Sequence, residues 1–192
     1  MKCLKDLGLA IVSVLSLLAV GAVPASADEV CTNTAVNCAQ ISTMTISQVG
    51  TGVLATTGGT TLVTCNAGDI HLSVKTQGSS VDPISGEVDT LNFTECTATV
   101  TTLANGTFDA STVGTNGTIA FTGSQVTVHP IFGASCVYGS DAAVDIGTTS
   151  GTSFHVTTTL PRSSGGFTCP ADILWTASYD ITNHTLVDWR NN

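Results

Sequence analysis

The chain has 192 residues, of which 42% are hydrophobic and 10% charged, with 5 Lys and Arg against 14 Asp and Glu. An acidic balance of this kind argues against nucleic acid and anionic membrane surfaces as partners, because both require clustered basic side chains. The hydrophobic content argues against a disordered chain, and the length suits one domain.

Residues 1–27 have the three parts of a secretory signal peptide. Two Lys lie within the first five residues, an apolar run extends from Leu7 to Val23, and Ala25-Ser26-Ala27 fits the small-x-small cleavage rule. The alternative is a membrane anchor, but the run of about 17 residues is short for a span, and the cleavage triplet follows at once. We therefore expect cleavage before Asp28, export, and no transmembrane segment in the mature chain.

Beyond the signal peptide, the recurring pattern is alternation of apolar and polar residues, which is typical of half-buried strands. The alternation occurs over residues 70–75, 117–121, 125–129 and 154–157, and it is longest over Trp175, Ala177, Tyr179 and Ile181. Thr and Val are abundant and suit pleated strands because both are β-branched. No segment has a convincing helical period.

Turn residues separate these runs at the spacing of a sandwich or barrel. Asn105-Gly106 and Asn116-Gly117 suit two-residue hairpin turns. Asn183-His184 is expected to turn a last hairpin that pairs Ile173–Ile181 with Thr185–Trp189. We predict an all-β fold, an antiparallel β-sandwich of Greek-key type, with a small barrel as the alternative. Residues 28–40 form an N-terminal arm, and residues 41–192 form the single domain.

Seven Cys occur, and the first leaves with the signal peptide. An even number of Cys in an exported chain predicts disulfides, although sequence alone does not choose the connectivity. Chain order and loop closure favour three pairs: Cys31–Cys38, Cys65–Cys96 and Cys136–Cys169. The alternative of a zinc site is disfavoured, because no Cys-x-x-Cys pair occurs and the His residues lie far from the Cys residues in the sequence.

The spacing Cys65…Cys96…Cys136-Val-Tyr138…Cys169-Pro170…Trp175-x-x-x-Tyr179 resembles that of a group of small exported proteins from high-GC Gram-positive bacteria, which are largely uncharacterised. The chain also has a weaker similarity to the secreted alkane-oxidation activator type of Gram-negative bacteria. Either resemblance covers about residues 60–192. It implies an exported, disulfide-bonded β scaffold and transfers no catalytic residue.

A calcium site is one candidate. Asp82, Glu87 and Asp89 surround a Gly turn, and Ca²⁺ prefers several oxygen ligands on a flexible loop. The alternative is a solvated acidic turn, and the spacing does not match the helix-loop-helix calcium loop.

Histidine and serine provide weaker candidates. His71, His129 and His155 fall on the polar phase of their strands, where they either converge on a metal or remain separate and solvated; separate residues are favoured. Ser153 lies near His155 and Ser135 near His129, but no local feature supplies the orienting group and oxyanion site that a catalytic triad needs. We predict no catalytic residue and no cofactor.

These patterns favour a non-enzymatic exported protein that acts as a structural or binding module at the cell surface or outside the cell, with a partner in the cell envelope or the extracellular space. The alternatives are a secreted hydrolase with a loop-assembled site and a calcium- or small-ligand-binding domain.

Overall fold

A computed structural model describes residues 28–32, 38–78, 82–113, 116–129, 133–148, 152–185 and 187–191. The predicted signal peptide lies outside these residues. The described part of the chain contains strands and no helix, which confirms the predicted all-β class. None of the described residues belongs to a helix long and apolar enough to cross a membrane.

Eleven strands are described. They are β1 (Asp28–Cys31), β2 (Thr43–Thr56), β3 (Thr61–Thr76), β4 (Ile84–Cys96), β5 (Thr99–Ala104), β6 (Thr107–Val113), β7 (Asn116–His129), β8 (Cys136–Thr148), β9 (Ser153–Ser164), β10 (Asp172–Ile181) and β11 (Asp188–Asn191).

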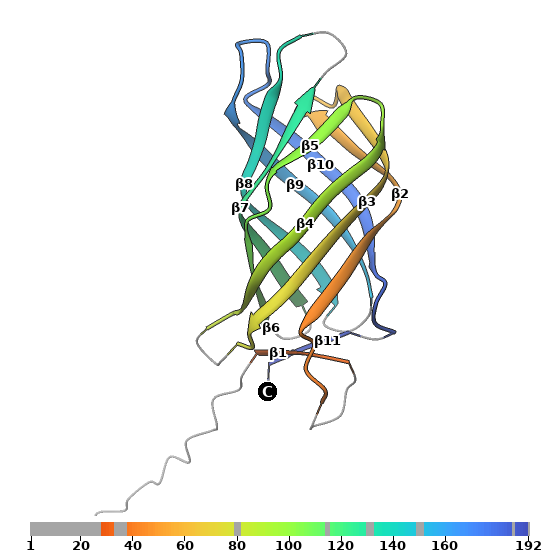
Figure 1. Cartoon of the computed structure of the whole chain (residues 1–192), viewed down its shortest axis with the longest axis vertical. Helices are drawn as coiled ribbons and strands as arrows, with labels where there is room; N and C mark the ends of the chain where they lie inside the picture. Colours follow the sequence, from red (N-terminus) through yellow and green to blue (C-terminus); the bar gives the residue numbers. More distant parts are fainter. Residues whose placement is uncertain are drawn as a thin grey trace, which may run out of the picture.

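The main sheet is a closed antiparallel barrel with eight strand positions, so the predicted two-sheet sandwich is wrong (Figure 1). Its order is β5-β7-β6-β4-β3-β2-β10-β9-β8, and a β7–β8 pairing closes the ring. Most neighbours are consecutive in the chain, which is the connectivity of an up-and-down barrel and not the predicted Greek key. Several strands are 13 to 16 residues long, and register shifts interrupt many of the pairings. Long, twisted strands with bulges curve a sheet until its edges meet, and closure leaves no edge strand exposed.

Strands β5 and β6 together occupy one position in the ring, because both pair with β7. Gly106 lies between them with φ of 78°, and a Cβ there would lie 2.3 Å from the carbonyl oxygen of Thr122. Asn105 donates from Nδ2 to the carbonyl oxygen of Asp89 at 2.7 Å. The Asn105-Gly106 pair is therefore a bend between two collinear strands and not the predicted hairpin turn.

Strand β10 shows how the alternating pattern builds the interior. Ile173, Trp175, Ala177, Tyr179 and Ile181 are all buried, and the residues between them are more exposed. The predicted stripe is confirmed, and it faces the inside of the barrel. The interior is apolar and belongs to one continuous core.

One end of the barrel, here called the ribbon end, is covered by the short antiparallel pair of β1 and β11 (Figure 1). Val30 and Val187 are fully buried there. The Gln77 side chain accepts from the Val30 amide at 3.2 Å and donates to the Ile41 carbonyl at 3.1 Å. The described residues of the predicted arm thus pack against the domain. The predicted last hairpin does not form, because β10 pairs with β2 and β9 while β11 pairs with β1.

The three predicted disulfides are present with the predicted pairing. They are Cys31–Cys38, Cys65–Cys96 and Cys136–Cys169. Cys65 and Cys96 are direct cross-strand partners on β3 and β4. Three disulfides are typical of a chain that folds in an oxidising or extracellular environment.

Candidate functional site

The barrel encloses a cavity of about 100 Å³ whose lining comes from strands all round the ring. An interior of this kind follows from the strand number, because an eight-stranded barrel is just wide enough for side chains to fill or to hold one small ligand. Apolar side chains dominate the lining, and among them are Ile46, Ile70, Val88, Leu91, Phe93, Val126, Phe154, Val156, Leu160 and Trp175. An apolar cavity stays dry and favours an apolar occupant.

The aromatic side chains on one wall hold each other in place. Trp175 donates from Nε1 to the Tyr179 hydroxyl at 3.1 Å, and its ring meets Phe93 edge-on with centroids 5.3 Å apart. Tyr179 stacks on Phe154 at 5.7 Å. Burial raises the pKa of Tyr179 far above its ordinary value, although the Trp175 hydrogen bond opposes this in part. The Tyr179 phenol therefore stays neutral in the cavity wall.

Tyr138 on β8 places the second phenol in the lining. The residue is 1% exposed, and no hydrogen-bond partner for its hydroxyl oxygen exists among the described residues. Burial raises the pKa of this phenol too, and Arg162 opposes the shift in part. The hydroxyl group keeps its proton at neutral pH and is available as a donor. A buried polar group without a partner costs about 1–3 kcal/mol, so its position calls for a functional explanation.

A second cavity, of about 280 Å³, lies toward the opposite end from the β1–β11 ribbon, here called the loop end. The loop end comprises residues 57–60, 97–98, 133–135 and 165–171. Tyr138 and Leu54 line both cavities, so Tyr138 stands at the boundary between the interior and the loop end. Phe167 in this region is 99% exposed.

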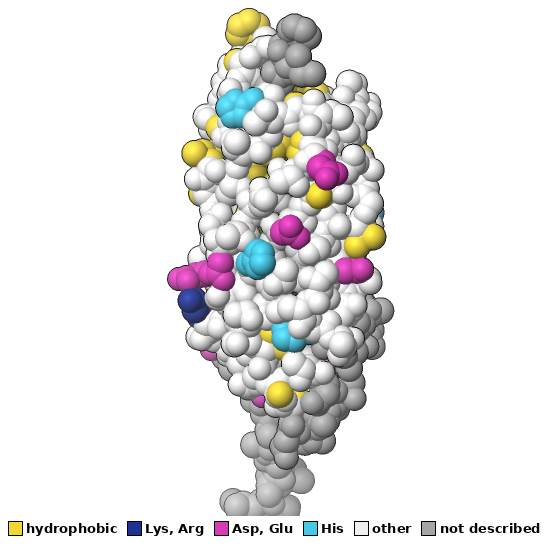
Figure 2. All heavy atoms as spheres, turned by 45° about the vertical axis from the view of Figure 1, so that its right-hand side comes forward, with side chains coloured by type: hydrophobic (Ala, Val, Ile, Leu, Met, Phe, Trp, Pro, Cys, Tyr) yellow, Lys and Arg dark blue, Asp and Glu magenta, His cyan; other side chains and the backbone are white. Residues whose placement is uncertain are grey.

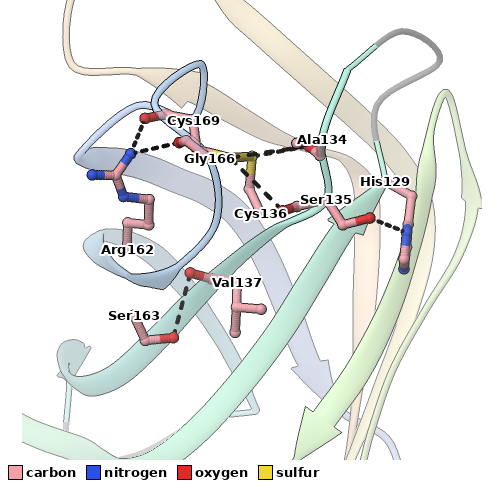
Figure 3. The surroundings of a disulfide bond; sticks show 9 residues. All are labelled: His129, Ala134, Ser135, Cys136, Val137, Arg162, Ser163, Gly166 and Cys169. Atoms are coloured by element: carbon pink, nitrogen blue, oxygen red, sulfur yellow. Dashed lines mark hydrogen bonds between the residues drawn. A yellow bond between two sulfur atoms is a disulfide. The ribbon is translucent and has the colours of Figure 1, made fainter.

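The connection between β9 and β10 at the loop end is tied down at several points (Figure 3). The Cys136–Cys169 disulfide joins it to the start of β8. Arg162 donates from Nη1 to the carbonyl oxygens of Gly166, at 3.1 Å, and of Cys169. These bonds place the connection beside the second cavity, which Thr168 and Pro170 help to line.

The candidate calcium ligands lie outside the barrel. Asp82, Glu87 and Asp89 are exposed, and their carboxylates do not form a compact cluster among the described residues. Glu87 lies 2.9 Å from Lys75, whose pKa is raised by that hydrogen bond. Asp89 accepts a hydrogen bond from Ser73. The calcium site stays a prediction, for which a rise in melting temperature with added Ca²⁺ is the test.

The three candidate His residues lie on strands that are not neighbours. His71 is on β3, His129 on β7 and His155 on β9, and all three are exposed. In Figure 2, the His side chains on the visible face lie apart from one another. The described residues contain no group of three metal-ligating side chains that includes a His.

The Ser135–His129 pair does meet, with Oγ and Nδ1 2.8 Å apart (Figure 3). The other ring nitrogen of His129 contacts the Thr101 hydroxyl at 3.4 Å. His155 contacts Ser178 and Thr157 through its two nitrogens, and Ser153 is not among these contacts. A serine nucleophile needs a base that a third group orients, and among the described residues the hydrogen bonds of His129 are to hydroxyl groups and not to a carboxylate.

Among the described residues, one compact group of potential metal ligands occurs, formed by Glu29, Cys31 and Cys38. Both Cys residues are joined in a disulfide. Because a thiolate is the form that binds metal, this group offers no thiolate ligand.

No protein-family model matches the chain, and neither does any curated protein or solved structure. The resemblance to small exported proteins of high-GC Gram-positive bacteria stays a prediction.

The sequence pattern indicated the interior face of β10 but not the cavity. In the sequence, Tyr138 belongs to the Cys136-Val-Tyr138 spacing, which predicts no role for its hydroxyl group. Residues two apart on a strand point to the same face, so Tyr138 shares a face of β8 with Cys136, and both are buried. This alternation is the sequence pattern that could have indicated an inward-pointing phenol.

Proposed function

We propose that this protein is a non-enzymatic exported binding module whose barrel holds a small, predominantly apolar molecule. The observation that carries the proposal is the cavity inside the closed barrel, lined from all sides by apolar side chains. The disulfides and the predicted signal peptide support action at the cell surface or outside the cell.

The chemistry of the lining supports binding over catalysis. Among the described residues, the titratable side chains of the lining are Tyr138 and Tyr179, both with pKa values raised by burial, and Cys65 is in a disulfide. A general base or acid works best with a pKa near the operating pH. Neutral phenols in an apolar wall orient a ligand and do not exchange protons at neutral pH.

The volume limits the ligand. An apolar cavity of about 150 Å³ binds benzene or xenon. The interior cavity, at about 100 Å³, suits xenon or a molecule of a few carbon atoms. A longer ligand has to extend toward the second cavity at the loop end.

Xenon binding followed by NMR chemical-shift changes tests the proposal. Val156 lines the cavity and is buried, so Val156→Phe fills part of the space and is expected to reduce xenon binding. Val49→Phe is the matched control, because Val49 lies on the outer surface. Near-ultraviolet circular dichroism shows whether each variant keeps its fold. No xenon binding by the wild type, or equal binding by a folded Val156→Phe variant, would overturn the proposal.

A further inference from the structure

We infer that the Tyr138 hydroxyl is the hydrogen-bond donor for the ligand, so that the barrel selects small uncharged molecules with an apolar chain and one acceptor oxygen, such as a ketone, aldehyde, ester or ether. This inference rests on the proposed function and names the ligand class of that same site.

The first reason is the position of the hydroxyl group. Tyr138 is buried, lines the interior cavity, and has no hydrogen-bond partner among the described residues. The hydroxyl oxygen of Tyr179 differs, because it already accepts a hydrogen bond from Trp175, whereas the Tyr138 hydroxyl makes none among the described residues. Tyr138 thus offers an unused O–H donor in apolar surroundings, where a hydrogen bond is stronger than in water.

The second reason concerns charge. Among the described residues, the interior lining contains no Lys, Arg or His. Arg162, the cation that acts on the Tyr138 phenol, lies outside this lining and donates from Nη1 to the carbonyl oxygens of Gly166 and Cys169. A carboxylate or phosphate inside the barrel would therefore be a buried charge without a partner. A neutral acceptor avoids that cost and satisfies the hydroxyl group. The ligand is therefore uncharged.

The third reason is the boundary position of Tyr138. It lines both the interior cavity and the cavity at the loop end, while β1 and β11 cover the ribbon end. A ligand that enters from the loop end meets Tyr138 on its way to the interior. Its oxygen then lies at the boundary and its apolar chain lies inside.

The experiment uses straight-chain methyl ketones of increasing length, each paired with the alkene in which a methylene group replaces the carbonyl oxygen. The members of a pair have nearly the same shape, so their affinity ratio measures the hydrogen bond. The wild type is expected to bind the ketone about tenfold more tightly than the alkene. Tyr138→Phe keeps the ring, and it is expected to bind both members of a pair with equal affinity.

Val49→Phe is the control, because Val49 lies on the outer surface and not in the lining, and it is expected to keep the ketone preference. The infrared carbonyl stretch of the bound ketone provides an independent measurement. Hydrogen bonding lowers its frequency in the wild type, and the frequency rises in Tyr138→Phe. A merely structural role of Tyr138 would not change this frequency.

The outcomes separate this inference from the proposed function. Equal binding of ketone and alkene by the wild type, or a preference that persists in Tyr138→Phe, overturns the role of Tyr138 and leaves apolar binding intact. Failure of ketone, alkene and xenon alike to bind overturns the proposed function as well.

Discussion

Gly52 on β2 makes room for the Trp175 indole ring. A Cβ at residue 52 would lie 2.4 Å from Trp175 Cη2 and 2.8 Å from Cζ2. Ordinary contact begins at 3.4 Å, so Gly52→Ala requires the indole ring to move by about 1 Å. The ring has little freedom to move, because it donates to Tyr179 and packs edge-on against Phe93.

The expected cost follows from these contacts. Overpacking a core costs about 1–3 kcal/mol, and loss of the Trp175–Tyr179 hydrogen bond adds about 1 kcal/mol. Replacing a strand Gly by Ala offsets about 0.5–1 kcal/mol of this cost, because Ala loses less backbone entropy than Gly on folding. We expect Gly52→Ala to lower the free energy of unfolding by roughly 1–3.5 kcal/mol.

Urea unfolding of the oxidised protein, followed by tryptophan fluorescence and circular dichroism, measures this change. Gly58→Ala is the control, because a Cβ there meets nothing closer than 3.7 Å, and we expect it to leave stability unchanged or raise it slightly. Combining Gly52→Ala with Trp175→Phe removes the closest contact, so the two changes should cost less together than the sum of their separate costs. A loss below about 0.5 kcal/mol for Gly52→Ala would refute the tight packing of the indole ring.

Further predictions concern the phenols and the disulfides. Both Tyr have pKa values raised by burial, whereas an unfolded Tyr titrates near about 10. The contribution of the two phenols to the free energy of unfolding should therefore be constant below that pH and fall above it. The reason is that the unfolded chain then binds fewer protons than the folded chain. Tyrosinate absorbance should appear together with unfolding, and two normal titrations in the folded protein would contradict this. Replacing both Cys65 and Cys96 by Ser opens a loop with a sequence separation of 31. The free energy of unfolding, measured with urea, should fall by roughly 3–4 kcal/mol. An unchanged unfolding midpoint would show that the loop-entropy reasoning fails here. The intact mass of the protein from culture fluid should show cleavage before Asp28. It should also show the loss of six hydrogens relative to the reduced chain, since six Cys follow the cleavage site. Free thiols would contradict the assignment of three disulfides.

The pairing of strands shows where reasoning from the sequence stopped. The alternating stripe over 173–181 indicated which side chains of β10 are buried, because alternation is a local property of an extended chain. The prediction that this strand pairs with residues 185–189 was wrong. Strand β10 instead pairs with β9 and with β2, which lies more than 100 residues earlier in the chain. A hairpin preference is local, whereas closure depends on the accumulated twist and register of every strand between the two edges.

The candidate site divides in the same way. Chain order and loop closure favoured three Cys pairs among several possible connectivities, and all three pairs are present. Asp82, Glu87 and Asp89 lie close together in the sequence and predicted a calcium site. In the structure they lie on the outside and do not form a compact cluster among the described residues. Tyr138 carried no local signal of function. Its significance comes from the absence of a partner for its hydroxyl group among residues that surround it from other strands.

The sequence by itself determined the all-β class and the inward face of β10, and it favoured the disulfide pairing without fixing it, because residue alternation and β-branched composition act over short stretches of chain. Only the tertiary structure decided between sandwich and barrel, and only it placed a cavity inside the ring with Tyr138 at its boundary. Both outcomes depend on which distant strands meet and on how much space their side chains leave between them, and no short stretch of sequence specifies either.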